Sequence, residues 1–594
     1  MSKINYQGNT TKIPEAFEGI QVNNCKNPKC DNFGAEPIIY KNLYNSQTEG
    51  SRTPHYVISG LGKGVPGIKC KACGEITPIK SNSSINEEKQ RLGAYLIDTP
   101  LFCTNDLCIN FKLSIIESPN SYYKFGKTTE NQRYQCKACQ KTFSTGNKRR
   151  TQRRSEINKS LYKALMNKMS VKRCCEFLEI SPQTYYRKID WLYEQALGFV
   201  RERERKLMKN LQISRLYLST DRQVHMSNWT QRNDKRNTEL LALGTADNIS
   251  GYVFGWHFNF DPLVSPQQIE NETAELNDYD KSVPFRKHAR LWLERDFEKA
   301  QKESFRNIAQ IHGSIEGDVA ARYAVETSRE NTEAVEEIDN TVKRPVNGML
   351  VHSEYTMYGH FQLLNELFSN TEKVRFYLDQ EAGIKNAFMG AFSDRVATHT
   401  ADAFYVRVNK GFTIDQKERL IYECHRRIKS ITGVAFRSMS AQEKEQAIIN
   451  LVIAEMGCLR RFNGSKESWL SYPFATKYEP EKMLAALTDI SDLSLEHQAR
   501  LYKKGSLHGI DRFFMQARRR VNIFERPFQS GTNARRVWYG YSPYDPGIYI
   551  KQAELFRLFY NYINIGKDKK TPAMRLGLAK GPVTYEKIIY FDSQ

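Results

Sequence analysis

The sequence predicts a multidomain protein in which an α/β domain follows a cysteine-rich N-terminal region and a short helical segment. Three observations support this fold class. At 594 residues the chain is too long for one ordinary core. Most of its cysteines occur in paired spacings before residue 140. From residue 211 onward, short apolar strands alternate with segments of helical periodicity, which is typical of an α/β domain.

Eight of the twelve cysteines form two similar sets, each a C-x4-C pair followed by a C-x2-C pair. The sets are Cys25, Cys30, Cys70 and Cys73, and then Cys103, Cys108, Cys136 and Cys139. Four thiolates with this spacing can surround one tetrahedral Zn²⁺ ion, so we expect two structural zinc ions. The segments NPKCDNFG and CKACGEIT recur in similar form as NDLCINFK and CKACQKTF, which indicates an internal duplication. We therefore predict two zinc ribbons, at residues 1–85 and 86–148.

A disulfide framework is the alternative interpretation of these cysteines. The start, MSKINYQGNTTKIPEAFEG, lacks the apolar core of a secretory signal, and no apolar run long enough for a membrane helix occurs. We therefore expect an intracellular protein without a membrane partner, and thiols inside cells stay reduced. The other four cysteines lie in helical patterns and are expected to be small core residues: Cys174, Cys175, Cys424 and Cys458.

Residues 149–200 predict three helices with the pattern of a helix-turn-helix unit. Ser181 followed by Pro182 combines an N-cap with a first-turn proline, so we expect a recognition helix from Pro182 to Tyr193. Five of its side chains would then face DNA: Gln183, Thr184, Tyr186, Arg187 and Lys188. A three-helix packing unit without DNA contacts is the alternative.

Charge favours a polyanionic partner. Lys and Arg number 88 against 67 Asp and Glu, which gives a formal net charge of +21. A basic surface can also serve solubility alone. The basic run at residues 146–156 predicts either a solvated linker or an arm along phosphates, and residues 201–210 predict a charged helical connector.

The segment 211–530 predicts the α/β domain. RLYLSTDRQVH predicts a strand that ends at Asp221, and ELLALGTADNISGYVFGWHF predicts two more strands around a turn. A helix follows at residues 355–368, and then KVRFYLD predicts a buried strand that ends at Asp379. Three strands, a helix and a strand with a second acid is the order of an RNase H-like domain. Ends of strands are where active sites of α/β sheets collect.

A third acid is expected on a later helix. Ile510, Phe514 and Ala517 recur at helical spacing, which predicts an amphipathic helix that begins near Asp511. Three basic residues on this helix are further candidates for DNA contact: Arg518, Arg519 and Arg520.

The chain resembles the DDE/DDD insertion-sequence transposases, which share a retroviral-integrase-like catalytic fold. The resemblance rests on four segments: STD at 219–221, YLDQE at 377–381, IDRFFMQARRRV at 510–521 and FYNYINIGKDKKTPAMRLGLAKG at 559–581. It implies that Asp221, Asp379 and Asp511 are catalytic. Many members of the family carry Glu at the third position, so Glu525 and Glu496 are the alternatives to Asp511.

Three clustered carboxylates would repel one another, so they favour a site for cations. Two Mg²⁺ ions, with Mn²⁺ as a substitute, would activate the attacking oxygen and stabilise the leaving oxygen of a phosphodiester. The resemblance implies metal-dependent strand cleavage and strand transfer on double-stranded DNA, at element ends and target. It also implies a homodimer or higher oligomer on DNA and a cytoplasmic, nucleoid-associated bacterial protein. The alternatives are a catalytically inactive DNA-binding regulator and a metal-dependent nuclease or resolvase without strand transfer.

Two insertions and a tail complete the expected organisation. The insertions lie at about 264–348 and 413–500, and the resemblance allows the second to be all-helical. The tail at 531–594 is basic and rich in aromatic residues. Its aromatic residues could stack on bases or pack against the catalytic domain, and packing is expected of Phe556, Phe559 and Tyr560.

Overall fold

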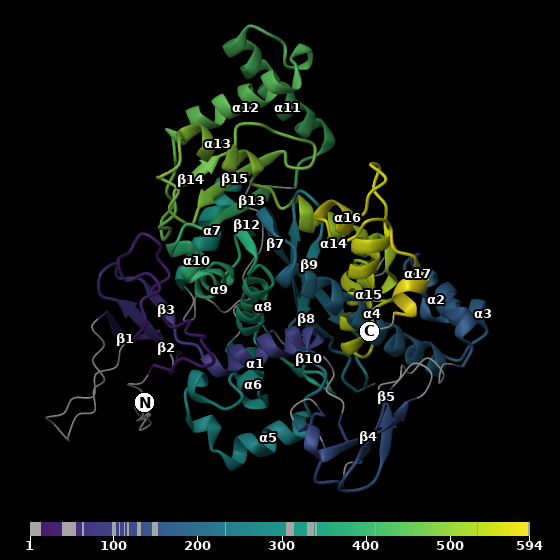
Figure 1. Cartoon of the computed structure of the whole chain (residues 1–594). Coiled ribbons are helices and arrows are strands. Elements are labelled where there is room, and N and C mark those ends of the chain that lie inside the picture. Colours follow the sequence, from purple (N-terminus) through teal and green to yellow (C-terminus); the bar gives the residue numbers. More distant parts are fainter. Residues whose placement is uncertain are drawn as a thin grey trace, which may run out of the picture.

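The computed structural model describes residues 13–37, 55–61, 65–97, 102–105, 107–111, 113–115, 118–127, 132–144, 153–231, 233–303, 314–328, 338, 341–409, 411–530 and 533–591. It contains a mixed α/β domain, with the cysteine-rich region and a three-helix segment placed around it (Figure 1).

The α/β domain is built on a seven-stranded mixed sheet of order β14-β15-β13-β12-β7-β8-β9. Its strands are β7 (Ile213–Ser227), β8 (Thr238–Asp247), β9 (Val253–Phe258), β12 (Thr371–Asp379), β13 (Ala401–Asn409), β14 (Trp469–Ser471) and β15 (Glu481–Ala486). The three central strands β7, β12 and β13 are parallel, and the outer strands pair antiparallel with their neighbours. The strands predicted from alternating apolar residues are therefore present. Asp221 differs from expectation in one respect, because it lies inside the long strand β7 and not at its end.

Helices cover both faces of the sheet because alternate side chains of its central strands are apolar on both sides. Phe376 of β12 packs against Phe361 of α8 (Ser353–Leu367) and Phe388 of α9 (Ile384–Ala391) on one face. The next residue, Tyr377, points the other way and donates a hydrogen bond to the Leu501 carbonyl of α13 (Leu495–Lys504). The α14 helix (His508–Arg520) lies on this second face, and short α10 (Ser393–Ala397) follows α9. The two faces thus carry different sets of residues, and Tyr377 marks the α13/α14 face.

Each cysteine-rich segment folds as a three-stranded antiparallel sheet. The first contains β1 (Tyr56–Leu61), β2 (Val65–Cys70) and β3 (Ile76–Pro78), and the second contains β4 (Tyr122–Lys127), β5 (Gln132–Cys136) and β6 (Thr142–Ser144). Helix α1 (Asn82–Gly93) and a 3-10 turn, η1 (Ala94–Leu96), join them. Helix α1 packs directly on α8 at Gly359, where an added Cβ would lie 2.8 Å from the Glu88 Cγ atom. The connection between the ribbons is therefore part of the α/β domain's surface layer.

The segment from 153 onward contains the three predicted helices α2 (Asn158–Leu165), α3 (Val171–Leu178) and α4 (Pro182–Lys209). The Ser181 side chain accepts a hydrogen bond from the Thr184 N–H, so the predicted N-cap is confirmed. The expected connector at 201–210 is not a separate element, because α4 continues unbroken through 28 residues to Lys209. One continuous helix therefore leads from the three-helix segment to the sheet.

The first insertion contains α5 (Pro266–Glu275), α6 (Glu294–Glu303) and α7 (Ile315–Ser328), framed by the short pair β10 (Phe260–Asp261) and β11 (Met349–Leu350). The second begins with α11 (Ile414–Thr432) and α12 (Ala441–Met456), which project from the end of the sheet in Figure 1. It is not all-helical, because β14 and β15 follow and extend the central sheet beyond β13. The outer part of the sheet is thus supplied by the insertion.

Strand β16 (Phe528–Ser530) comes just before the C-terminal tail and pairs with its first strand, β17 (Asn533–Trp538). The tail then contains α15 (Gly547–Leu558), a π-helical turn η9 (Phe559–Ile563), α16 (Pro572–Leu576) and α17 (Tyr585–Ile589). Phe556 packs on Phe513 of α14, and Phe559 and Tyr560 are also buried. These three aromatic residues therefore pack against the α/β domain, as expected. Within the residues described, no helix has the length and apolar character needed to cross a membrane.

A buried ionic cluster joins α4 to the tail and the sheet. Arg557 of α15 forms an ion pair with Glu204 of α4 at 2.6 Å, and both side chains are buried. Arg557 also donates to the Phe254 carbonyl of β9 at 2.9 Å, and Tyr95 of η1 donates to the second carboxylate oxygen of Glu204. Burial acts to lower the pKa of Arg557, but the facing carboxylates of Glu204 and Glu554 prevail and raise it well above its ordinary value. Four separate elements are therefore held by one charge pair.

We predict that Glu204→Gln lowers the free energy of unfolding by about 3–5 kcal/mol, because it leaves the Arg557 charge buried without a full partner. Urea denaturation measures this loss. Glu202→Gln on the same helix is the matched control, because Glu202 pairs with Lys206 at the exposed surface and such a pair contributes at most about 0.5 kcal/mol. Equal effects of the two variants would contradict the prediction.

Candidate functional site

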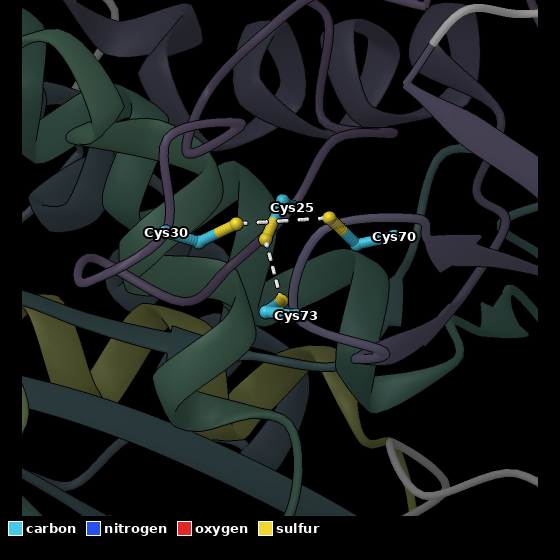
Figure 2. Close-up of side chains that lie close together, drawn as sticks. All are labelled: Cys25, Cys30, Cys70 and Cys73. Atoms are coloured by element: carbon cyan, nitrogen blue, oxygen red, sulfur yellow. Dashed lines mark hydrogen bonds between the residues drawn. The ribbon is translucent and has the colours of Figure 1, made fainter.

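The first cysteine set meets in space although its two pairs are far apart in the sequence. Figure 2 shows Cys25 and Cys30 from one loop facing Cys70, the last residue of β2, and Cys73 in the turn that follows it. The Cys25 and Cys73 sulfurs lie 3.5 Å apart, and the Cys30 and Cys70 sulfurs lie 3.7 Å apart. Tetrahedral Zn²⁺ with Zn–S bonds of about 2.3 Å requires sulfurs about 3.8 Å apart. The distances thus fit one zinc ion.

The second set repeats this arrangement. The Cys103 and Cys139 sulfurs lie 3.3 Å apart, and those of Cys108 and Cys136 lie 3.7 Å apart. All four ligand atoms of each set lie within 4.8 Å of one another. The eight cysteines are free thiols, which excludes the disulfide framework for them. Both sets are compatible with zinc binding.

The residues around the two sets also correspond. The Asn32 side chain donates to the Cys70 sulfur at 3.5 Å, and Asn110 donates to Cys136 at 3.3 Å. Tyr56 accepts a hydrogen bond from the Cys25 N–H, as Tyr122 does from Cys103. N–H groups directed at sulfur favour the thiolate, which is the form that binds metal. The duplication predicted from the sequence therefore extends to the hydrogen bonds that orient the ligands.

The thiol pKa values differ within a set. A backbone hydrogen bond from Lys141 holds the pKa of Cys139 at about 6, so this sulfur is largely ionised at neutral pH. Burial instead raises the pKa of Cys103 to about 12. Four neighbouring thiols cannot all ionise without a compensating cation, because their negative charges repel. A bound Zn²⁺ would remove that penalty.

The remaining cysteines lie outside these groups. Cys174 and Cys175 are on α3, and Cys424 is on α11, where its thiol donates to the Pro473 carbonyl. Cys174 is buried, as expected of a core residue, whereas Cys458 is exposed and departs from that expectation.

Two of the expected catalytic acids lie on neighbouring parallel strands. Leu378 of β12 pairs with Thr220 of β7, so the next position of the same register sets Asp379 beside Asp221. Neighbouring strands are about 4.8 Å apart, and side chains at matched positions point to the same face. Alternation from Tyr377 places Asp379 on the α13/α14 face. Alternation from Ser219, whose hydroxyl accepts a hydrogen bond from the Ile510 N–H of α14, places Asp221 there too.

The third expected acid, Asp511, lies in the first turn of α14, which is anchored to this face by specific contacts. The Asn248 amide accepts a hydrogen bond from the Gly509 N–H at 2.9 Å and donates to the Ser506 carbonyl at 2.8 Å. Gly244 pairs with Asp221 across the β7–β8 ladder, and a Cβ on Gly244 would lie 2.7 Å from the Ile510 Cδ1 atom. The absence of a side chain at Gly244 therefore lets α14 approach the strand that bears Asp221.

Basic side chains accompany the three acids. The Arg407 guanidinium of β13 lies 3.5 Å from the Asp379 carboxylate. Burial lowers the pKa of Arg518, and the charges of Asp511 and Asp221 act against that shift, which places Arg518 within electrostatic range of both acids. Among the described residues, only the two cysteine sets gather three or more ligand atoms within 4.8 Å, so the acids are more widely spaced than metal ligands.

The two alternatives for the third acid are engaged elsewhere. Glu525, which follows α14, pairs with Lys168 at 2.6 Å, and Lys168 belongs to the turn between α2 and α3. Glu496 lies in the first turn of α13 and pairs with Arg500 of the same helix at 2.9 Å. Asp511 is thus the acid whose position on its helix is fixed by the contacts of α14 with β7.

The expected DNA-facing residues divide into two groups. Gln183, Tyr186 and Arg187 are exposed and Thr184 is half-buried, so these side chains can reach a partner. Lys188 corrects the expectation, because it is only 3% exposed. Its ammonium group donates to the Asn158 side chain at 2.7 Å and to the carbonyls of Arg153 and Arg154. On α14, Arg519 is exposed, whereas Arg518 and Arg520 are half-buried, and Arg520 lies over the Phe559 ring. Residues 146–152 of the expected basic arm lie outside the described residues.

Sequence reasoning missed the residues that organise the acids. Arg407, Ser219 and Asn248 are ordinary polar residues of strands and a turn, and Gly244 is one of many glycines. The only signal in the sequence was a glycine inside an apolar strand, which often marks close approach of another element. Comparison of the chain with protein-family models and with curated proteins finds no match.

We predict that the purified, reduced protein carries about two zinc ions per chain and that Cys136→Ser lowers this to about one, because each set needs four thiolates. Elemental analysis by mass spectrometry measures the content. Cys458→Ser is the matched control and should keep the full amount, since Cys458 is exposed and outside both sets. A zinc content near zero in the unaltered protein would refute the assignment.

Proposed function

We propose that the protein is a DNA transposase that binds the ends of a mobile element and catalyses metal-dependent strand cleavage and strand transfer. The observation that carries this proposal is the placement of Asp221 and Asp379 at matched positions of two parallel strands, with the Asp511-bearing helix anchored over the same face. Each acid is supplied by a different element, which is typical of a site built for chemistry at a sheet.

The strand arrangement supports an RNase H-like catalytic domain. Three consecutive strands, β7, β8 and β9, form an antiparallel meander, and β12 and β13 add in parallel on the other side of β7. Helix α8 separates β9 from β12 in the sequence, in the order expected from the sequence pattern. Fold alone does not specify activity, so the proposal depends on the acids and not on the sheet.

The three carboxylates would hold two Mg²⁺ ions, or Mn²⁺ in their place, which supply charge neutralisation and activation of an attacking oxygen during phosphoryl transfer. Asp221 and Asp379 would provide oxygen ligands from the rigid strands, and Asp511 would complete the set from α14. The Arg407 guanidinium lies 3.5 Å from the Asp379 carboxylate, and Arg518 lies within electrostatic range of Asp221 and Asp511, so both arginines offset part of the repulsion among the three acids. The same site can use water as the nucleophile in strand cleavage and a DNA 3′ hydroxyl as the nucleophile in strand transfer, since both reactions are in-line displacements at phosphorus.

Recognition of DNA is assigned to the helix-turn-helix unit, at the exposed N-terminal residues of α4. The unbroken helix α4 fixes the distance between this surface and the ionic cluster at Glu204, and so fixes DNA relative to the sheet. Assembly as a dimer or larger oligomer on DNA remains part of the proposal, because two element ends must be processed together.

Two other functions stay as alternatives. A regulator that binds DNA without cleaving it would keep the ribbons and α4 but would show no metal-dependent activity. A nuclease or resolvase would cleave but would not join strands. Labelled element-end DNA incubated with Mg²⁺ distinguishes the three functions, because it reports cleavage and joining as separate products.

We predict that Asp221→Asn, Asp379→Asn and Asp511→Asn each abolish Mg²⁺-dependent cleavage and joining while DNA affinity and zinc content stay unchanged. Each amide keeps the shape of the side chain but removes the charge that binds a cation. Asp492→Asn is the control, because Asp492 is exposed in a loop before α13. Wild-type cleavage by the Asp379 variant would defeat the proposed mechanism.

We further predict different outcomes for two neighbouring residues of α4. Arg187→Ala should weaken DNA binding and lower the slope of affinity against salt by about 1, because an exposed phosphate contact is lost. Lys188→Ala should instead lower stability by about 1–3 kcal/mol, since the groups that Lys188 bonds lose a buried donor. Filter binding at several salt concentrations and thermal denaturation separate the effects. If the Lys188 variant lost as much DNA affinity as the Arg187 variant and kept full stability, Lys188 would be a DNA-contacting residue and this prediction would be wrong.

A further inference from the structure

The two ribbons share their metal-ligand geometry but differ in what surrounds them. In each, a tyrosine that begins the first strand pairs with the third cysteine: Tyr56 with Cys70, and Tyr122 with Cys136. The shared register continues to the next position, so Val57 corresponds to Tyr123. The β4–β5 register shifts after Lys124, so Ser59 and Phe125 correspond by their distance from the tyrosine. Differences between the ribbons can therefore be assigned to particular residues.

Ribbon 1 (residues 13–37 and 55–80) is docked on the α/β domain. Lys80 at its end forms a buried ion pair with Glu354 of α8 at 3.0 Å, and the following Ser81 N–H donates to the Tyr355 hydroxyl. Phe33 of its first cysteine loop packs against the main core, and a Cβ on Gly34 would lie 3.4 Å from Ser393 of α10. Figure 1 shows β1–β3 beside α9 and α8. This ribbon is part of the scaffold.

Ribbon 2 (the described residues from 102 to 144) has an apolar cluster made of its own side chains around Cys103, Tyr122 and Cys136. Figure 1 shows its strands at a different side of the molecule from ribbon 1. Its first cysteine loop exposes Leu107 and Ile109, where ribbon 1 has Lys29 and Asp31. Large exposed apolar side chains gathered on one small module mark an interaction surface.

One face of the β4–β5 hairpin combines aromatic rings with cations; we call it the aromatic face. Tyr123 is 54% exposed and Phe125 is 46% exposed, and their spacing by two residues puts both on the side of β4 opposite Tyr122. On β5, Arg133 and Gln135 belong to the same face, because Gln135 pairs with Tyr123, and Lys137 directly follows the strand.

The cations of the aromatic face lie next to its rings. The Lys137 ammonium is 4.5 Å from the centre of the Tyr123 ring, and the Arg133 guanidinium is 5.6 Å from that of Phe125. The part of ribbon 2 that the structure describes contains no Asp or Glu. The described part of this face therefore offers flat apolar rings beside two cations.

We propose that the aromatic face of ribbon 2 binds single-stranded DNA by stacking unpaired bases on Tyr123 and Phe125 while Arg133 and Lys137 contact the flanking phosphates. Rings interleaved with cations suit a strand whose bases are unstacked, because every base has a π face and every linkage has a charge. A duplex hides its base faces, so stacking selects the single strand. Ribbon 1 lacks this function, since Val57 and Ser59 occupy the equivalent positions.

This proposal is separate from the proposed catalysis, because it needs neither the three acids nor Mg²⁺. The probe is fluorescein-labelled oligo(dT) of about 15 nucleotides, a length within the range that stacking grooves cover. Fluorescence anisotropy with the full-length chain, in buffer without Mg²⁺, measures affinity. We expect tighter binding of oligo(dT) than of its duplex with oligo(dA), measured with the Asp379→Asn variant so that cleavage of the probe plays no part.

The double variant Tyr123→Ala and Phe125→Ala should weaken oligo(dT) binding at least tenfold, because the stacking of two bases is lost. Zinc content reports whether the ribbon stays folded. The conservative variant Tyr123→Phe keeps a ring and should bind nearly as wild type does. Val57→Ala with Ser59→Ala in ribbon 1 is the matched control and should leave affinity unchanged.

Two outcomes would overturn the proposal. Unchanged oligo(dT) affinity in the double variant, with full zinc content, would leave the aromatic face to another partner such as a protein. Equal loss of duplex and single-strand binding would assign the face to duplex backbone contacts. Loss of cleavage in the acid variants has no bearing on either result, so failure of the proposed catalysis and failure of this proposal are distinguishable.

Discussion

The close approach of α14 to β7 and β8 is the constraint on which the candidate catalytic site depends. It requires a residue without a Cβ at Gly244, because Ile510 and Phe514 occupy the space that a side chain would fill. Ser219 and Asn248 then bind the first turn of α14 through its backbone, so the helix cannot slide along the sheet. Backbone N–H groups of a first helical turn need such partners, since they have none within the helix. The result fixes Asp511 over the face that bears Asp221 and Asp379.

A second constraint is a buried ion pair that connects α4, the C-terminal tail and the sheet. The Glu204–Arg557 pair lies where α4, the tail helix α15, strand β9 and the turn η1 meet. A buried charge pair contributes little net stability compared with apolar packing, but it is specific, because a shifted element would leave a charge unpaired. This specificity fixes the position of α4 relative to the sheet. Because α4 is one unbroken helix, its N-terminal end also keeps a fixed position relative to the sheet.

The duplicated ribbons illustrate how one metal-ligand scaffold can acquire different surfaces. The ligand spacing, the asparagine that bonds a sulfur and the tyrosine that bonds a backbone N–H occur in both. These residues support the cysteines, so they are tied to the metal site. The outward faces of the strands do not contact the cysteines, so their residues can differ between the two ribbons. In ribbon 1, Lys80 and the loop at Gly34 contact α8 and α10. In ribbon 2, the outer face of β4 exposes Tyr123 and Phe125.

Local patterns in the sequence determined the secondary structure and the metal ligands. Alternating apolar residues predicted β12, Ser181 and Pro182 predicted the start of α4, and cysteine spacing predicted both sets. Each of these signals depends on residues close in sequence or on a fixed ligand geometry, so no knowledge of the fold is required.

Tertiary structure decided which polar residues are buried, how the sheet is extended and which residues lie beside the acids. A lysine in a helix predicts an exposed charge, yet Lys188 is buried because carbonyls of a preceding segment surround it. The second insertion adds β14 and β15 to the sheet, since the open edge of β13 offers hydrogen-bonding groups that an all-helical insert would leave unpaired. Likewise, the partners of the acids, Arg407 and Arg518, come from a strand and a helix far from Asp379 and Asp221 in the chain. Contacts between distant segments depend on packing of the whole molecule, and a pattern of neighbouring residues does not encode them.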